Sequence, residues 1–234
     1  MINELKKIVD GCKICNGDGI KIVKTDEGWV LEDCECVKKI SKDVKLIRAN
    51  IPDQYWGYDI DNLSKKFMNR NKKSLDLVRK YVSSIDKRIK NGHGLWFSSG
   101  TGLGKSVIAA YVLKHAIDAG YTAYMDRASH LVNLKFRALK DVEAYDLIDY
   151  IVKEVDILVI EEIEKVFLSG VEAMNYQLYC EFLSDVYDAK KSLILTSNES
   201  RKKVLPRFQP FIQDRLKTIK EINFIGKSER ETIV

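Results

Sequence analysis

The sequence is short of the features that mark disordered or repetitive chains. It has only three prolines in 234 residues, and no low-complexity stretch or internal repeat is visible. With 45% hydrophobic and 31% charged residues, its composition is that of an ordinary globular protein. A chain of this length can bury one good-sized core, with room for a small appendage.

Long hydrophobic runs are also missing. The longest apolar runs, such as residues 157–160, are far too short to cross a bilayer. The first residues, MINELKK, lack the apolar stretch and small-residue cleavage site of a secretory signal. We therefore expect a cytoplasmic protein with no membrane partner.

Net charge is a mild +5, but it is unevenly spread. Residues 64–90 carry ten Lys or Arg residues against Asp76 and Asp86. Such a run could follow a phosphate backbone. More often, a charge run is only the solvated side of a helix.

Strand and helix patterns alternate over most of the chain. This alternation predicts an α/β fold in which helices cover a parallel sheet. The expected strands are residues 94–98, 121–125, 157–160, 192–196 and 219–225, and the expected helices are residues 72–90, 105–119, 128–139, 142–153, 171–189 and most of 205–216.

A glycine-rich loop stands between the first of these strands and the helix after it. Residues 99–106 read SGTGLGKS, close to the phosphate-binding pattern G-x-x-x-x-G-K-[ST]. In that pattern backbone N–H groups surround the phosphates, the lysine reaches the outer ones and the hydroxyl ligates magnesium. Ser99 replaces the first glycine, and it must accept a turn that glycine adopts more easily. The nucleotide-binding candidates are Ser99, Gly100, Thr101, Gly102, Leu103, Gly104, Lys105 and Ser106.

Two carboxylates follow the buried run at residues 157–160. Glu161 and Glu162 could hold the magnesium shell and orient or deprotonate the attacking water. Asp is usual at the first position, and Glu161 moves the carboxylate by roughly 1.5 Å. Asn198, after the strand at residues 192–196, could hold the water or the terminal phosphate, although Ser-Asn also simply starts turns.

These pieces, in this order, resemble the AAA+ ATPases, and among them the helicase loaders of the DnaC/DnaI type. The resemblance covers nearly the whole chain, though only the phosphate loop is specific by itself. It rests on residues 51–55 (IPDQY), 98–106 (SSGTGLGKS), 158–163 (LVIEEI), 195–198 (LTSN), 211–216 (FIQDRL) and 226–230 (GKSER).

The resemblance implies roles for individual residues. Glu161 and Glu162 correspond to the Walker B pair, Asn198 to sensor 1 and, loosely, Arg230 to sensor 2. Arg215 corresponds to an arginine finger that acts on a neighbouring subunit's nucleotide, so self-association is expected. The plain alternative is that Arg215 is one more surface cation on a helix. The catalytic candidates are Lys105, Glu161, Glu162, Asn198 and Arg215, with Ser106 and Glu161 as magnesium ligands.

Four of the five cysteines crowd into the first 36 residues. Cys12 and Cys15 form a C-x-x-C pair, and Cys34 and Cys36 form a tighter C-x-C pair. Four thiolates from two such pairs suit tetrahedral zinc, while scattered or redox thiols are the alternative. We expect a zinc-binding domain over residues 1–48, a junction over 49–71 and the ATPase domain over 72–234. In loaders of the DnaI kind the zinc domain contacts the helicase, so the resemblance implies that role here.

Loaders of this family bind single-stranded DNA through a helical insertion before the Walker B strand. In this chain the region contains Lys135, Phe136, Arg137 and Lys140, a mixture suited to stacking and phosphate contact. The same segment has a core-facing side, and Phe136 could belong to either face.

The resemblance favours a weak ATPase that loads a replicative helicase onto single-stranded DNA, with ATP or ADP, magnesium and zinc as its cofactors. A transposition helper ATPase of the IstB type is a second hypothesis. A third is a nucleotide-gated helicase-binding protein with little ATP turnover, which Ser99 and Glu161 keep open.

Overall fold

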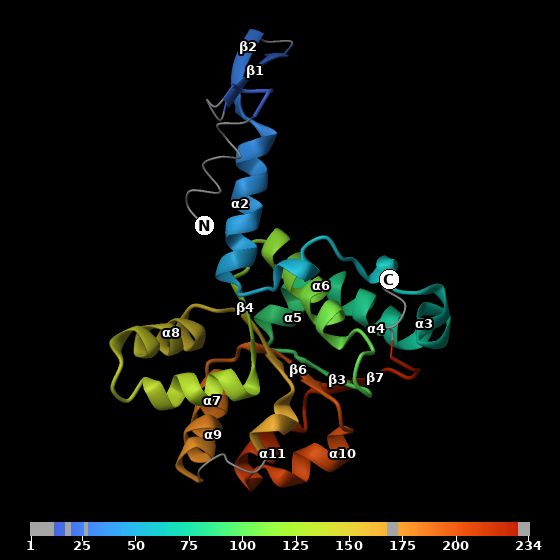
Figure 1. Ribbon diagram of the computed structural model, residues 1–234, viewed down its shortest axis with the longest axis vertical. Helices are drawn as coiled ribbons and strands as arrows, with labels where there is room; N and C mark the ends of the chain where they lie inside the picture. Colours follow the sequence, from blue (N-terminus) through green and yellow to red (C-terminus); the bar gives the residue numbers. More distant parts are fainter. Residues whose placement is uncertain (1–11, 17–19, 26–27, 168–172, 229–234) are drawn as a thin grey trace. The chain divides into compact units, whose positions relative to one another are not determined.

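The computed structural model describes residues 12–16, 20–25, 28–167 and 173–228 (Figure 1). The chain forms two compact units, Met1–Arg48 and Ala49–Val234. Among the described residues, no helix combines the length and apolarity needed to span a bilayer. Arg230, the loose sensor 2 candidate, lies outside the described residues.

The described part of the first unit contains a hairpin followed by a helix. Strands β1 (Ile20–Thr25) and β2 (Gly28–Asp33) pair antiparallel, and α2 (Glu35–Arg48) follows directly. This helix was not among those expected from the sequence. Its apolar positions 37, 40, 44 and 47 do recur at helical spacing, and Lys45 and Arg48 in the last turn complement the helix dipole.

The second unit is built on a five-stranded sheet in the order β4-β5-β6-β3-β7. Every neighbouring pair is parallel, which confirms the predicted sheet. Residues 157–160 of the interior strand β5 are fully buried, as expected for a strand covered on both faces. The strands are β3 (Leu95–Ser98), β4 (Ala123–Arg127), β5 (Ile157–Glu161), β6 (Ser192–Ser197) and β7 (Lys220–Asn223).

Helices cover the sheet, with α6 lying on the face opposite α9 and α11 (Figure 1). Alternate strand residues such as Leu158 and Leu195 pack with α9 and α11 in one core cluster. The helices are α3 (Lys65–Arg70), α4 (Lys72–Val82), α5 (Ile85–Lys90), α6 (Lys105–Asp118), α7 (Ala128–Arg137), α8 (Val142–Lys153), α9 (Ala173–Asp188), α10 (Arg201–Val204) and α11 (Pro210–Leu216), with 3-10 turns η1 (Asp53–Tyr55), η2 (Ile60–Asn62), η3 (Ile163–Phe167) and η4 (Leu205–Arg207).

The expected single helix over residues 72–90 is interrupted at Ser83 and Ser84. The hydroxyl of Ser84 donates to the carbonyl of Lys80 at 3.0 Å, so a side chain competes there with the helical backbone pattern. The basic run at residues 64–90 is thus divided among α3, α4 and α5.

Residues 49–71, expected as a junction, fold as part of the second unit. The Lys114 ammonium of α6 donates to the carbonyls of Tyr55 and Trp56 at 3.0 and 3.1 Å, and also to that of Tyr58. The Asn71 side chain exchanges hydrogen bonds with the backbone of Ile225 at 2.8 and 2.9 Å. These long-range contacts are invisible to local sequence patterns.

Candidate nucleotide site and cysteine cluster

The strand order brings the expected nucleotide-site residues to one edge of the sheet. Strand β6 lies between β3, which leads into the glycine-rich loop, and β5, which ends at Glu161. Because all of these strands are parallel, the loop, the two glutamates and Asn198 follow neighbouring carboxyl ends.

The loop places its left-handed residues at glycines. Gly102 and Gly104 have φ of +77° and +72°, whereas Ser99 has no positive φ. The missing first glycine therefore imposes no backbone strain here. A Cβ on Gly102 would come within 2.2 Å of the Ser228 hydroxyl oxygen, so the loop also packs closely against residue 228.

Lys105 is only 7% exposed and begins α6. Its ammonium donates to the carbonyls of Ser99 and Gly100 at 3.2 and 3.0 Å, and to the Ser99 hydroxyl at 3.0 Å. A fourth bond, at 2.9 Å, reaches Oδ1 of Asn198. The lysine thus joins the loop to the end of β6.

Glu161 lies beside Ser106, the residue expected to share magnesium with it. Burial raises the pKa of the Glu161 carboxyl, and the neighbouring Glu162 carboxylate raises it further. A hydrogen bond from Ser106 acts in the opposite direction and lowers it. A hydroxyl and a carboxylate in contact are oxygen donors of the type magnesium prefers, so this pair fits the expected metal ligands.

Glu162 has an unusual backbone conformation, with φ of +53°. Its N–H donates to Oγ1 of Thr196 on β6 at 3.1 Å, and Thr196 is only 1% exposed. A non-glycine residue in the left-handed region is strained unless its surroundings hold it there. Thr196 is therefore a site residue that the sequence analysis missed.

Glu164 is a second missed residue. It follows β5 in η3 and is 6% exposed, and its Oε1 accepts from the backbone N–H and the side-chain Nδ2 of Asn198 at 3.1 and 2.8 Å. The only sequence signal was a third glutamate two residues after the expected pair.

Arg215 is not brought to this edge. Its guanidinium bonds Asp188 at 3.1 and 3.2 Å and lies 5.5 and 5.7 Å from the ring centres of Tyr187 and Phe211. Asp188 comes four residues before β6 starts, so this cluster is near the edge where the strands begin. Four to six strand residues, roughly 13–20 Å, separate that edge from the loop.

The residues expected to bind DNA lie at the end of α7 and in the turn before α8. Lys135 forms a 3.7 Å ion pair with Asp185, and Arg137 forms a 2.5 Å ion pair with Asp141. Lys140 is exposed, and Phe136 is 38% exposed. Phe136 thus has solvent access, and further exposed apolar side chains next to it are Leu139, Val142 and Tyr145.

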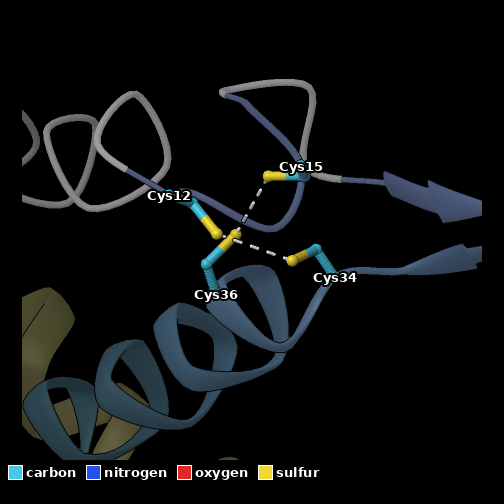
Figure 2. Close-up of side chains that lie close together, drawn as sticks. All are labelled: Cys12, Cys15, Cys34 and Cys36. Atoms are coloured by element: carbon cyan, nitrogen blue, oxygen red, sulfur yellow. Dashed lines mark hydrogen bonds between the residues drawn. The ribbon is translucent and has the colours of Figure 1, made fainter.

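The four cysteines of the first unit converge from the 12–15 turn and the start of α2 (Figure 2). Their sulfurs all lie within 4.8 Å of one another. The Cys12–Cys34 and Cys15–Cys36 sulfur distances are 3.7 and 3.6 Å. Zn–S bonds of about 2.3 Å in a tetrahedron place sulfurs about 3.8 Å apart, so the cluster is compatible with zinc.

Two thiols in this cluster have pKa values shifted in opposite directions. Backbone N–H groups of Cys15 and Ile14 lower the pKa of Cys12 to about 6, while burial raises the pKa of Cys36 to about 12. The fifth cysteine, Cys180, is fully buried in the core of the second unit, as expected from its apolar helix.

A glycine-rich loop with a buried lysine, next to a carboxylate that follows a buried interior strand, defines a P-loop ATPase with the AAA+ fold. Residues 73–216 match the model of the IstB-like ATP binding protein family, and the chain belongs to that family. No curated protein matches this sequence.

Solved structures with the same fold include the DnaC helicase loader, DnaI and a replication initiator. The DnaC helicase loader is 18% identical, with a TM-score of 0.62 over 74% of this chain and 100% of that one. DnaI is 17% identical, with a TM-score of 0.58 over 76% of this chain and 94% of that one. A replication initiator DnaA, bound to AMPPCP and single-stranded DNA, is 16% identical, with a TM-score of 0.55 over 71% of this chain and 52% of that one.

Proposed function

We propose that this ATPase is a helicase loader, which binds a replicative hexameric helicase and helps to place it on single-stranded DNA. The observation that carries the proposal is the combination of an AAA+ unit with a separate four-cysteine unit in one chain. The similarity of this chain to the DnaC and DnaI structures supports the same function.

In the ATP site, Lys105 would bind the outer phosphates, and Ser106 and Glu161 would hold magnesium. Glu162 would orient or deprotonate the attacking water, and Asn198 would contact that water or the terminal phosphate. The bound metal would supply neutralisation of the developing phosphate charge.

Arg215 would act on the nucleotide of a neighbouring subunit. Its position near the opposite edge of the sheet supports this assignment, because an arginine side chain cannot span that distance within one subunit. In the single chain the Arg215 guanidinium is paired with Asp188. It must break this ion pair to reach a neighbouring subunit's nucleotide. Self-association is therefore part of the proposal.

Cys12, Cys15, Cys34 and Cys36 would hold a structural zinc ion, and the metal would stabilise the small first unit. That unit would be the contact for the helicase.

The turn between α7 and α8 would contact single-stranded DNA. Phe136 and Tyr145, 38% and 56% exposed, offer rings on which bases can stack. Lys140 supplies positive charge beside them, while Arg137 is paired with Asp141 and Lys135 with Asp185. The arrangement combines the stacking and electrostatic elements of a single-strand binding surface.

The decisive measurement is the ATPase rate of the full chain alone, with single-stranded DNA, with a hexameric replicative helicase, and with both. We expect a slow rate alone and stimulation by helicase and DNA together. Absence of stimulation and of co-purification with any replicative helicase would contradict the loader proposal.

A transposition helper is the second candidate, because the matching family model is the IstB-like one. Such a protein would respond to duplex target DNA and a transposase. Including both in the same assay separates the two functions. Nucleotide-dependent helicase binding without turnover would instead indicate a gated binding protein.

A further inference from the structure

The carboxylate of Glu164 binds Asn198 through one of its two oxygens. One carboxylate oxygen, Oε1, accepts both the backbone N–H and the Nδ2 of Asn198, at 3.1 and 2.8 Å. The other, Oε2, is buried and has no hydrogen-bond partner in the part of the chain that the structure describes. Leaving a buried carboxylate oxygen unpaired is costly, so a purely structural role accounts poorly for this residue.

The two neighbours of the Asn198 amide fix its orientation. Lys105 can only donate, and the Glu164 carboxylate can only accept. Oδ1 of Asn198 therefore faces Lys105 and Nδ2 faces Glu164. The opposite rotation of the amide would set donor against donor and acceptor against acceptor.

This balance changes when nucleotide enters. In the proposed ATP complex the Lys105 ammonium would turn to the outer phosphates, so Oδ1 of Asn198 would lose its bond to Lys105. Glu164 then remains as the group that fixes the amide. Because Nδ2 carries two hydrogens and Glu164 takes one, the second stays available for a ligand.

We propose that Glu164 is a positioning residue, which orients the Asn198 amide so that its remaining N–H can contact the terminal phosphate or the attacking water. The inference rests on the proposed role of Asn198 and on ATP binding, and it does not depend on helicase loading. If the inference is right, changing Glu164 weakens recognition of the third phosphate. This can be measured by nucleotide binding, without ATP hydrolysis.

The test compares the dissociation constants of ADP and AMPPCP for the full chain by titration calorimetry with magnesium present. For Glu164→Ala we expect the preference for AMPPCP over ADP to fall about tenfold, with ADP affinity within about twofold of wild type. Asn198→Ala should show the same loss. The double variant should lose no more than Asn198→Ala, because both changes remove one interaction.

Conservative and control variants separate positioning from other roles. Glu164→Gln keeps an acceptor for both Asn198 donors and should recover most of the preference. Glu181→Ala, an exposed glutamate on α9, should leave both constants unchanged. If Glu164→Ala does not fold, as judged by its melting curve, Glu164→Met retains the volume and removes the acceptors.

Three results would overturn the inference. Wild-type preference in a folded Glu164→Ala or Glu164→Met variant, with the preference lost in Asn198→Ala, would remove Glu164 from the site's function. If Glu164→Gln and Glu164→Ala lose the preference for AMPPCP equally, the negative charge of Glu164 would be what matters, and not its positioning of Asn198. Unchanged preference in Asn198→Ala would instead refute the assumed role of Asn198.

Discussion

The ammonium of Lys105 donates to Oδ1 of Asn198 at 2.9 Å, across the gap between the glycine-rich loop and the end of β6. Together with its bonds to Ser99 and Gly100, this contact gives the buried lysine protein acceptors in the absence of nucleotide. In the proposed ATP complex, phosphate oxygens would replace these acceptors, and as charged partners they would form stronger hydrogen bonds.

Replacing Lys105 by Ala should weaken ATP and ADP binding by about a hundredfold or more, because the charge that meets the outer phosphates is removed. Titration of a fluorescent ATP analogue measures the loss. Lys140→Ala, at an exposed position outside the loop, is the matched control and should bind normally. Near-normal binding by folded Lys105→Ala would refute the phosphate-loop assignment.

Replacing Glu161 by Gln should stabilise the nucleotide-free protein at neutral pH. Burial raises the pKa of this carboxyl, so its ionised form destabilises the folded state relative to the unfolded one. The neutral amide removes that cost. Each kcal/mol relieved should raise the melting temperature by about 2–4 °C.

The stabilisation by Glu161→Gln should depend on pH. Below the usual carboxyl range the folded and unfolded states are both protonated, so the advantage of the variant should vanish on acidification. It should grow as pH rises from the usual carboxyl range toward the raised pKa, and level off above it. The same variant should lose most of its magnesium-dependent nucleotide binding. An advantage that does not change with pH would show that the carboxyl charge is not its cause.

Mixing two inactive variants tests whether Arg215 acts between subunits. Arg215→Ala should bind nucleotide normally but hydrolyse it at least about 10³-fold more slowly than wild type under stimulating conditions. Lys105→Ala keeps Arg215 but lacks the phosphate-binding lysine. A mixture of the two should regain activity, since one subunit supplies the arginine and the other the nucleotide. Failure of the mixture, with both variants assembling normally, would argue against action in trans.

The purified protein should contain one zinc ion per chain, measured by elemental analysis. Cys15→Ser or Cys34→Ser should lower that content and make residues 1–48 more sensitive to protease, because a unit this small depends on metal for stability. Cys180→Ala is the control: it alters a buried cysteine of the second unit and should retain full zinc content. Metal-free wild-type protein with a protease-resistant first unit would contradict a structural zinc site.

The sequence predicted the sheet and the phosphate loop well, because both depend on local patterns. Apolar runs such as residues 157–160 identify buried strands, and a Gly-Lys-Ser run between a strand and a helix, as at residues 104–106, is typical of phosphate-binding loops. The sequence also identified the four cysteines that converge in the first unit.

The missed features depend on contacts between distant parts of the chain. Glu164 and Thr196 are site residues because β5 and β6 lie side by side, and nothing local distinguishes them from other polar residues at strand ends. The consensus pattern suggested a difficult turn at Ser99, whereas the positive φ angles of the loop fall at its glycines. Residues 49–71 looked like a junction because their partners, Lys114 and Ile225, are far away in sequence.

Helix α6 begins at Lys105 and, nine residues later, anchors three backbone carbonyls through Lys114. Nine helical residues span about 13.5 Å of a stiff rod. Residues 55–58 are therefore coupled mechanically to the position of the first turn of α6. If α6 rotates slightly when phosphates bind, residues 55–58 would move with it. These residues lie only a few positions after Ala49, where the second unit begins.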